Sequence, residues 1–190
     1  WNVDFPWATH PVIISEVTNK GAGDDACAGE DWVELYNMAS TPQSVVGMSL
    51  DDSSSSPELG VMSDLPAEVA AGKALVLGQG SCPTIIPAFG FLVLCKGDYA
   101  YTFDPYINGS LSEGSPSVSG CGFGFGNGAA DDVVLFDVDA HLSSNITVAN
   151  ILDRTGVWNE GLGNNPGDTQ SLGRNWASGG EFALMDERTL

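Results

Sequence analysis

Short apolar segments alternate with polar, glycine-rich or proline-containing stretches along the whole chain. The alternation in Trp32–Asn37 places Val33 and Leu35 on one face of a strand, which can then pack on a second sheet. Seven segments have the length and the β-branched or aromatic content of strands: Val12–Val17, Trp32–Asn37, Ser44–Leu50, Lys73–Leu77, Phe91–Cys95, Val133–Phe136 and Ile146–Leu152. So many short strands separated by turn residues predict a β-sandwich or a β-barrel.

Helix-forming composition occurs only in Leu65–Gly72, with Asp64 as a candidate N-cap. At about two turns this segment is too short to define a helical fold. Three stretches are typical of loops: Gly21–Asp31, Asp51–Pro57 and the long Tyr99–Gly128. The length of 190 residues fits one domain, so we expect an N-terminal arm over residues 1–10 and one domain over 11–190.

The chain is strongly acidic, with six Lys and Arg against 25 Asp and Glu and a net charge of −19. Nucleic-acid and anionic-membrane binding need basic residues, so both are excluded as functions. A hydrophobic content of 43% excludes global disorder. No apolar run reaches the roughly 18 residues of a membrane-spanning helix, so we expect no membrane insertion. The first residues, WNVDFPWATH, contain no Met and no signal peptide, which favours a mature or trimmed product.

Four cysteines, Cys27, Cys82, Cys95 and Cys121, have long spacings and form no CxxC pair. This pattern favours two disulfides over a zinc site, with three pairings open, and the alternative is four buried thiols. We favour Cys95–Cys121, which would fasten the long loop, together with Cys27–Cys82. The N-glycosylation sequons at Asn108 and Asn145, the low lysine content and the low pI favour a secreted or cell-surface glycoprotein.

Catalytic motifs are weak in this chain. A Ser–His–acid triad needs a suitably placed histidine, and neither His10 nor His141 lies in a recognisable motif. The glycine run Cys121–Gly128 is not followed by Lys, so it reads as a tightly turning loop and not as a phosphate cradle. Its alternating Phe123 and Phe125 are either buried on one face or exposed for a partner, and we favour burial. We therefore expect no enzyme and no cofactor other than Ca²⁺, which is a candidate.

Paired acids are the candidate metal ligands, because Ca²⁺ prefers about six to eight oxygen ligands. The first candidates are Asp51, Asp52, Asp131 and Asp132. No EF-hand spacing is present, and the alternative is that these acids cap turns and keep the surface soluble.

Two aromatic segments are candidate interaction sites. Tyr99, Tyr101 and Phe103 share one face if the chain is extended there, and that face either stacks on a glycan or packs inside the protein. Trp1, Phe5 and Trp7 make the N-terminal arm apolar, so the arm either folds back or docks on a neighbouring subunit. A head-to-tail contact of that kind that does not close produces a filament.

Several motifs, in order along residues 11–190, resemble the lamin tail domain family. They are Ile13-Ile-Ser-Glu-Val, Asp31-Trp-Val-Glu-Leu-Tyr-Asn, Gly47-Met-Ser-Leu-Asp, Leu65-Pro-Ala followed by Lys73–Leu77 or Phe91–Leu94, Asp132-Val-Val-Leu-Phe-Asp and Ser171-Leu-Gly-Arg174. The chain departs from the family in segment 78–90, in the 99–128 insertion and in its cysteines, and is most similar to the secreted members. The resemblance implies an immunoglobulin-like β-sandwich that binds or scaffolds and supplies no catalytic residues.

The sequence therefore predicts an all-β, immunoglobulin-like sandwich with long, disulfide-fastened loops. The expected function is a non-catalytic structural or adhesive module outside the cell, self-associating or binding other extracellular proteins, as in a filamentous assembly. The alternatives are a glycan- or calcium-binding module and an accessory domain of a secreted hydrolase.

Overall fold

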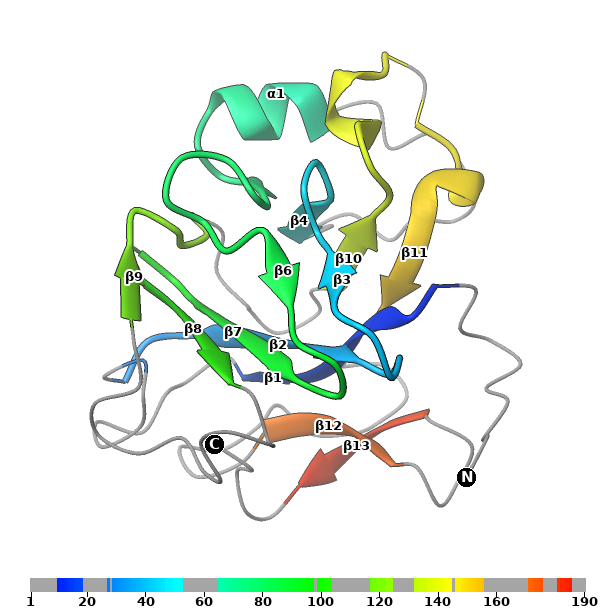
Figure 1. Cartoon of the computed structure of the whole chain (residues 1–190). Coiled ribbons are helices and arrows are strands. Elements are labelled where there is room, and N and C mark those ends of the chain that lie inside the picture. The colour runs from blue at the N-terminus through cyan, green and yellow to red at the C-terminus, as the bar shows by residue number, and fades with distance from the viewer. Residues whose placement is uncertain are drawn as a thin grey trace.

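Two packed β-sheets make up the fold of the chain (Figure 1). The structure, a computed structural model, describes residues 10–18, 27, 29–52, 65–97, 99–103, 117–124, 132–144, 146–155, 171–175 and 181–185. None of the helices in this described part is long and apolar enough to cross a membrane.

The larger sheet has seven antiparallel strands in the order β13-β12-β1-β2-β7-β8-β9. Its strands are β1 (Val12–Thr18), β2 (Trp32–Asn37), β7 (Phe91–Cys95), β8 (Tyr99–Phe103), β9 (Ser117–Ser119), β12 (Ser171–Asn175) and β13 (Glu181–Met185). Strands from the two ends of the chain pair within this sheet, where Glu16 of β1 lies opposite Gly173 of β12. This pairing joins the C-terminal strands β12 and β13 to the N-terminal strands in one sheet.

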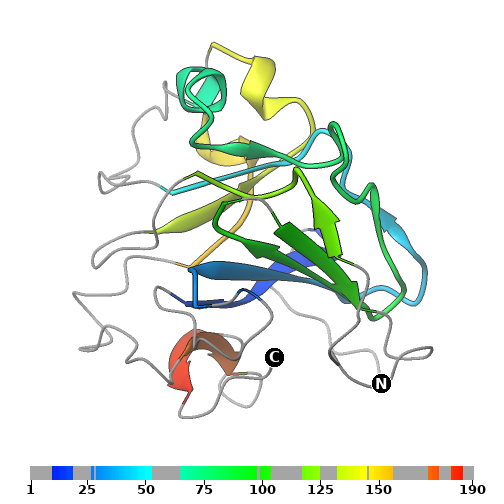
Figure 2. The same cartoon turned by 90° about the vertical axis from the view of Figure 1, so that its left-hand side faces the viewer.

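The smaller sheet has four strands in the order β11-β10-β4-β5. These are β4 (Ser49–Asp52), β5 (Leu75–Val76), β10 (Val133–Phe136) and β11 (Ile151–Arg154). A separate two-stranded ribbon pairs β3 (Gln43–Ser44) with β6 (Ile85–Ile86). Figure 2, turned from Figure 1, shows the ribbon at one side of the sandwich.

The main core lies between the two sheets because every second residue of each strand points inward. Its fully buried members come from both layers: Val12, Ile14, Val33, Leu35, Leu92, Leu94 and Leu172 from the larger sheet, and Leu50, Val133 and Leu135 from the smaller. The fold class is thus the expected one, an all-β sandwich.

A second cluster covers the other face of the smaller sheet. The short helix α1 (Leu65–Ala70) and the 3₁₀ turn η1 (Ala140–Leu142) pack there on Val134 and Phe136. A second 3₁₀ turn, η2 (Val148–Asn150), leads directly into β11. The smaller sheet is therefore buried on both faces, which explains why β10 reads as a continuous apolar run.

The most regular strand predictions are confirmed. Trp32–Asn37, Phe91–Cys95 and Val133–Phe136 match β2, β7 and β10 to the residue. Val12–Val17 gains one residue, and the predicted helix begins at Leu65 as expected, although its proposed cap, Asp64, lies outside the described residues.

Other predictions are wrong about where strands begin and end. The predicted strand Ser44–Leu50 is two strands, because Gly47 turns the chain with φ of +83° between β3 and β4. Lys73–Leu77 shortens to β5, and Ile146–Leu152 contains η2 before β11 begins. Residues 99–128 are not simply a loop, because β8 and β9 extend the larger sheet from within them.

Candidate functional site

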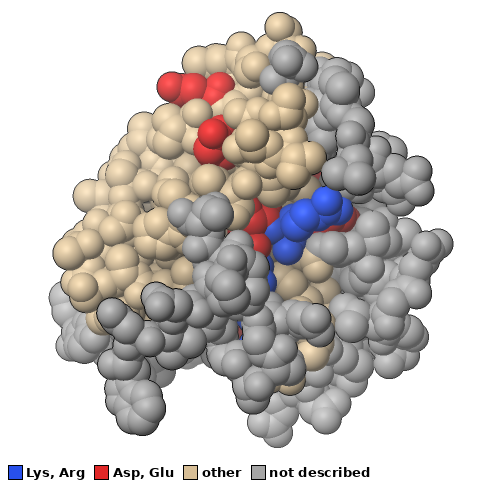
Figure 3. Space-filling view, turned by 90° about the vertical axis from the view of Figure 1, so that its right-hand side faces the viewer, with Lys and Arg blue, Asp and Glu red and all other residues tan. Residues whose placement is uncertain are grey.

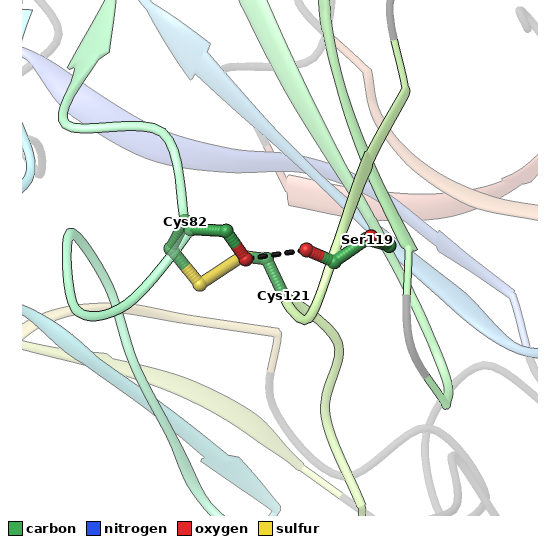
Figure 4. Close-up of a disulfide and its surroundings, with 4 residues drawn as sticks. Cys82, Ser119 and Cys121 are labelled. Carbon is green, nitrogen blue, oxygen red and sulfur yellow. Dashed lines mark hydrogen bonds between the residues drawn. A yellow bond between two sulfur atoms is a disulfide. The ribbon is translucent and has the colours of Figure 1, made fainter.

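Two disulfides fasten the loops to the sandwich. Cys27 is bonded to Cys95 at the end of β7, with the Cα atoms 5.4 Å apart. Cys82 is bonded to Cys121, with the Cα atoms 4.8 Å apart. Figure 4 shows this second bond beside the hydrogen bond that the Ser81 hydroxyl donates to the Ser119 carbonyl. Both bonds are typical of proteins that fold in an oxidising compartment.

The favoured pairing of Cys95 with Cys121 and of Cys27 with Cys82 is therefore wrong. Lys96 forms a bridge with Phe123, so the backbones near Cys95 and Cys121 do run close together. Their side chains, however, point to opposite faces of the larger sheet. Cys95 packs with Trp32 on the outer face, whereas Cys121 lies with Cys82 in the main core.

Loss of either disulfide is expected to destabilise the protein by about 2–4 kcal/mol. The test is urea unfolding of Cys27→Ser/Cys95→Ser and Cys82→Ser/Cys121→Ser against the unchanged protein. The first pair closes the longer loop, with a sequence separation of 68 against 39, and should cost slightly more. Wild-type unfolding midpoints in both double variants would contradict this expectation.

The described part of the glycine run, residues 121–124, is held against neighbouring backbone by hydrogen bonds, and we call it the strap. The Gly124 N–H donates to the Lys73 carbonyl at 3.0 Å, and the Gly97 N–H donates to the Phe123 carbonyl at 3.0 Å. A Cβ on Gly124 would overlap the Gly72 carbonyl oxygen. Phe123 is buried in the main core, as favoured, and Phe125 lies outside the described residues. Glycine is therefore needed at position 124 because two backbone segments come into close contact there.

Gly124→Ala is expected to cost about 1–3 kcal/mol, because the added methyl group must displace packed backbone. Thermal unfolding followed by circular dichroism measures the effect. Gln79→Ala is the control, since Gln79 is exposed, and should change stability by less than about 0.5 kcal/mol. Equal melting temperatures for the two variants would show that the strap tolerates a side chain.

The fold brings three of the predicted calcium ligands to neighbouring strands, because Asp52 of β4 lies opposite Val133 of β10, the residue next to Asp132. Asp132 is buried and forms an ion pair with Arg154, while its second carboxylate oxygen accepts a hydrogen bond from Thr155 at 3.3 Å. Asp51 and Asp52 are consecutive in β4, and Asp131 lies outside the described residues. No three His, Cys, Asp or Glu side chains converge as a metal site within the described ranges. Calcium binding thus stays a prediction.

Asp51 is the most unusual of these acids. It is 4% exposed, and its Oδ1 has no hydrogen-bond partner in the described part of the chain. Burial, with added repulsion from Asp52 and Glu68, raises the pKa of Asp51 to about 7. Near neutral pH this carboxyl group is therefore poised to take up a proton or a cation.

The aromatic candidates lie partly within the described chain. Tyr99–Phe103 is extended as β8, as the shared face requires. Tyr101 is partly buried against Cys27, Trp32, Val93 and Cys95, which favours packing over glycan stacking at that position. The arm residues Trp1, Phe5 and Trp7 and the sequons at Asn108 and Asn145 lie outside the described residues.

Both histidines hold local structure. The His10 Nδ1 accepts a hydrogen bond from the Val12 N–H at 3.1 Å, and burial lowers the pKa of His10. The His141 Nδ1 lies 3.3 Å from the Ser49 hydroxyl, and both of these side chains are buried. A buried Ser–His contact offers a substrate no direct access.

An ion pair that spacing alone does not predict ties the two sheets together. Arg174 of β12 is 7% exposed, contacts Asp153 of β11, and donates from Nε to the Ile14 carbonyl at 2.6 Å. The other oxygen of Asp153 accepts the Ile14 N–H at 2.7 Å. Burial raises the pKa of Asp153 and Arg174 acts in the opposite direction. The signal for this tie was the Ser171-Leu-Gly-Arg174 motif.

A buried pair of glutamates lies on the outer face of the larger sheet. Glu16 and Glu34 are directly opposite each other on β1 and β2. The Ser15 hydroxyl donates to Glu34 Oε1 at 2.6 Å, and the Ser171 hydroxyl donates to Glu16. Burial, strengthened by repulsion from Glu16, raises the pKa of Glu34 to about 8. The available sequence signal was an acid between Trp32 and Tyr36, on the face expected to be solvated.

Comparison with known proteins leaves the family open. No family model matches the chain. No curated protein matches it either. Among solved structures, it is similar to a DUF4876 family protein from Bacteroides thetaiotaomicron VPI-5482, with 11% sequence identity and a TM-score of 0.48, over 93% of this chain and 68% of the other.

Proposed function

We propose that the chain is a non-catalytic structural or adhesive module of the cell exterior that self-associates into a surface or filamentous assembly. The observation that carries the proposal is the pair of disulfides built into a β-sandwich, since such bonds persist in oxidising compartments. The lamin-tail-like motifs support a scaffolding role. His141 and Arg174 make contacts within the fold, and so do the glycines at 97 and 124.

Native assembly tests the proposal. Electron microscopy of native material and sizing with light scattering of the purified chain should show species larger than one subunit. Deletion of residues 1–10 separates the contribution of Trp1, Phe5 and Trp7 from that of the sandwich. A monodisperse monomer at every concentration, with or without the arm, would overturn the assembly role.

A calcium-binding module is the second candidate, favoured by the unpartnered Asp51 oxygen. Millimolar Ca²⁺ should then raise the melting temperature relative to EDTA, and Asp51→Asn should abolish that increase. Glu30→Gln is the matched control, because Glu30 is an exposed acid on a distant loop. Identical melting curves in Ca²⁺ and EDTA would remove this candidate.

A further inference from the structure

Three described segments carry no charge at all. They are residues 35–50, 74–95 and 117–124, and the chain's six basic and 25 acidic residues all lie elsewhere. Many of these residues are buried, where charged side chains are rare, but the exposed residues among them are uncharged too, which is unusual on the surface of a protein with a net charge of −19.

The three segments come together in space. The first two pair through β3 and β6, and the Val45 N–H donates to the Thr84 carbonyl at 3.0 Å. The third segment is joined to the second by the Cys82–Cys121 disulfide. Together they form one surface over the ribbon and the neighbouring strap, which we call the neutral face.

The neutral face also exposes apolar side chains. Val46 is 45% exposed and Ile85 is 52% exposed. The other exposed residues of these segments are uncharged: Ser40, Thr41, Pro42, Ser44, Gln79, Gly80, Ser81, Thr84, Ser119, Gly120 and Gly124. In Figure 3 the left-hand side of the molecule at mid-height, where Figures 1 and 2 place the ribbon, is an unbroken tan surface. Asp139 lies at its border, where the Asp139 N–H donates to the Gly47 carbonyl.

We infer that the neutral face is where a second copy of this chain docks, an inference that rests on the self-association proposed above. A charged group that a partner buried against this face would lose its hydration without meeting a counter-charge, so the face favours an uncharged partner surface. Two chains of charge −19 repel wherever their acidic surfaces meet, so the neutral face opposes their approach less than an acidic surface does. A two-fold contact places the face of one copy on the same face of the other.

Salt dependence distinguishes this contact from one made of ion pairs. Added salt screens the repulsion between the two acidic bodies and leaves the apolar contact intact. Association through the neutral face should therefore tighten between about 0.05 M and about 0.5 M NaCl, whereas a contact made of salt bridges would weaken.

The test is sedimentation velocity of the full chain over a concentration series. Val46→Asp/Ile85→Asp should weaken self-association at least tenfold, because each copy would bury two unpaired charges. Val148→Asp is the matched control, since Val148 is 59% exposed and lies on η2, outside the neutral face. It should associate like the unchanged protein. Circular dichroism melting of each variant shows that the fold is retained.

The outcomes separate the two ideas. If the unchanged protein associates and Val46→Asp/Ile85→Asp associates equally well, the neutral face is not the contact and the proposed self-association stands on another surface. Weakening with added salt overturns the neutral face in the same way. If the unchanged protein stays monomeric throughout, the self-association itself is overturned, and this inference with it.

Discussion

Arg174→Ala is expected to lower the free energy of unfolding by about 3–5 kcal/mol, because it leaves a buried carboxylate without its counter-charge. Arg174 contacts Asp153 on the opposite sheet, and its guanidinium carbon lies 4.5 Å from the centre of the Phe182 ring. The variant loses the ion pair, the hydrogen bond to Ile14 and the ring contact together. Urea denaturation at constant pH measures the difference.

The loss should depend on pH and on the partner. Without Arg174, the pKa of Asp153 should rise further, because burial then faces only the backbone hydrogen bonds from Ile14 and Arg154, so the variant should be less impaired at pH 5 than at pH 8. Arg174→Met/Asp153→Leu should recover much of the stability, since an apolar pair can replace a buried ion pair. Lys73→Ala is the surface control, because Lys73 is 61% exposed beside Glu68. Equal effects of Arg174→Ala and Lys73→Ala would show that the tie contributes little.

The protein is expected to become less stable as the pH rises from about 5 to 8. The carboxyl group of Glu34 titrates near its ordinary value of 4.5 in the unfolded chain and at about 8 in the folded one. Over this range the folded state therefore holds a proton that the unfolded state has released. The free energy of unfolding falls as the pH rises. The penalty is absent below the unfolded pKa and complete above the folded one, at about 3–5 kcal/mol.

Glu34→Gln should remove most of this pH dependence and stabilise the protein at pH 8. Glutamine keeps an oxygen that accepts the Ser15 hydroxyl, but it cannot ionise. A shallower slope should remain from Asp51, whose pKa rises from 3.8 to about 7 by burial, and Asp51→Asn should reduce it. Glu30→Gln is the control, because Glu30 is an exposed acid. Parallel stability profiles for Glu34→Gln and the unchanged protein would contradict this assignment.

Sequence pattern predicted the parts of the fold that local chemistry determines. β2 and β10 matched to the residue, because alternation or an unbroken apolar run fixes both the strand and its limits. β9 and β12 were missed, because Ser117–Ser119 and Ser171–Asn175 are polar or glycine-containing and become strands only by pairing with neighbours.

The candidate site was less predictable, because it depends on which face of a strand a side chain occupies. The backbones near Cys95 and Cys121 lie close together in space, yet the two side chains point to opposite faces. Nothing in their sequence spacing reveals this. Glu34 follows the predicted alternation, but the face it shares with Trp32 is buried, so an acid expected in water lies inside the protein. The Arg174–Asp153 tie joins two sheets and needs the assembled sandwich.

The meeting of β1 with β12 has a consequence for the order of folding. Arg174 and the Ile14 carbonyl that it contacts are 160 residues apart, so the larger sheet stays open until nearly all of the chain is present. During synthesis, β1 can pair early with β2, and β2 with β7, while the other edge of β1 stays unpaired. Such distant pairing slows folding and leaves a strand edge exposed in the meantime. Closure by β12 is thus expected to be a late step, after β1, β2 and β7 have paired.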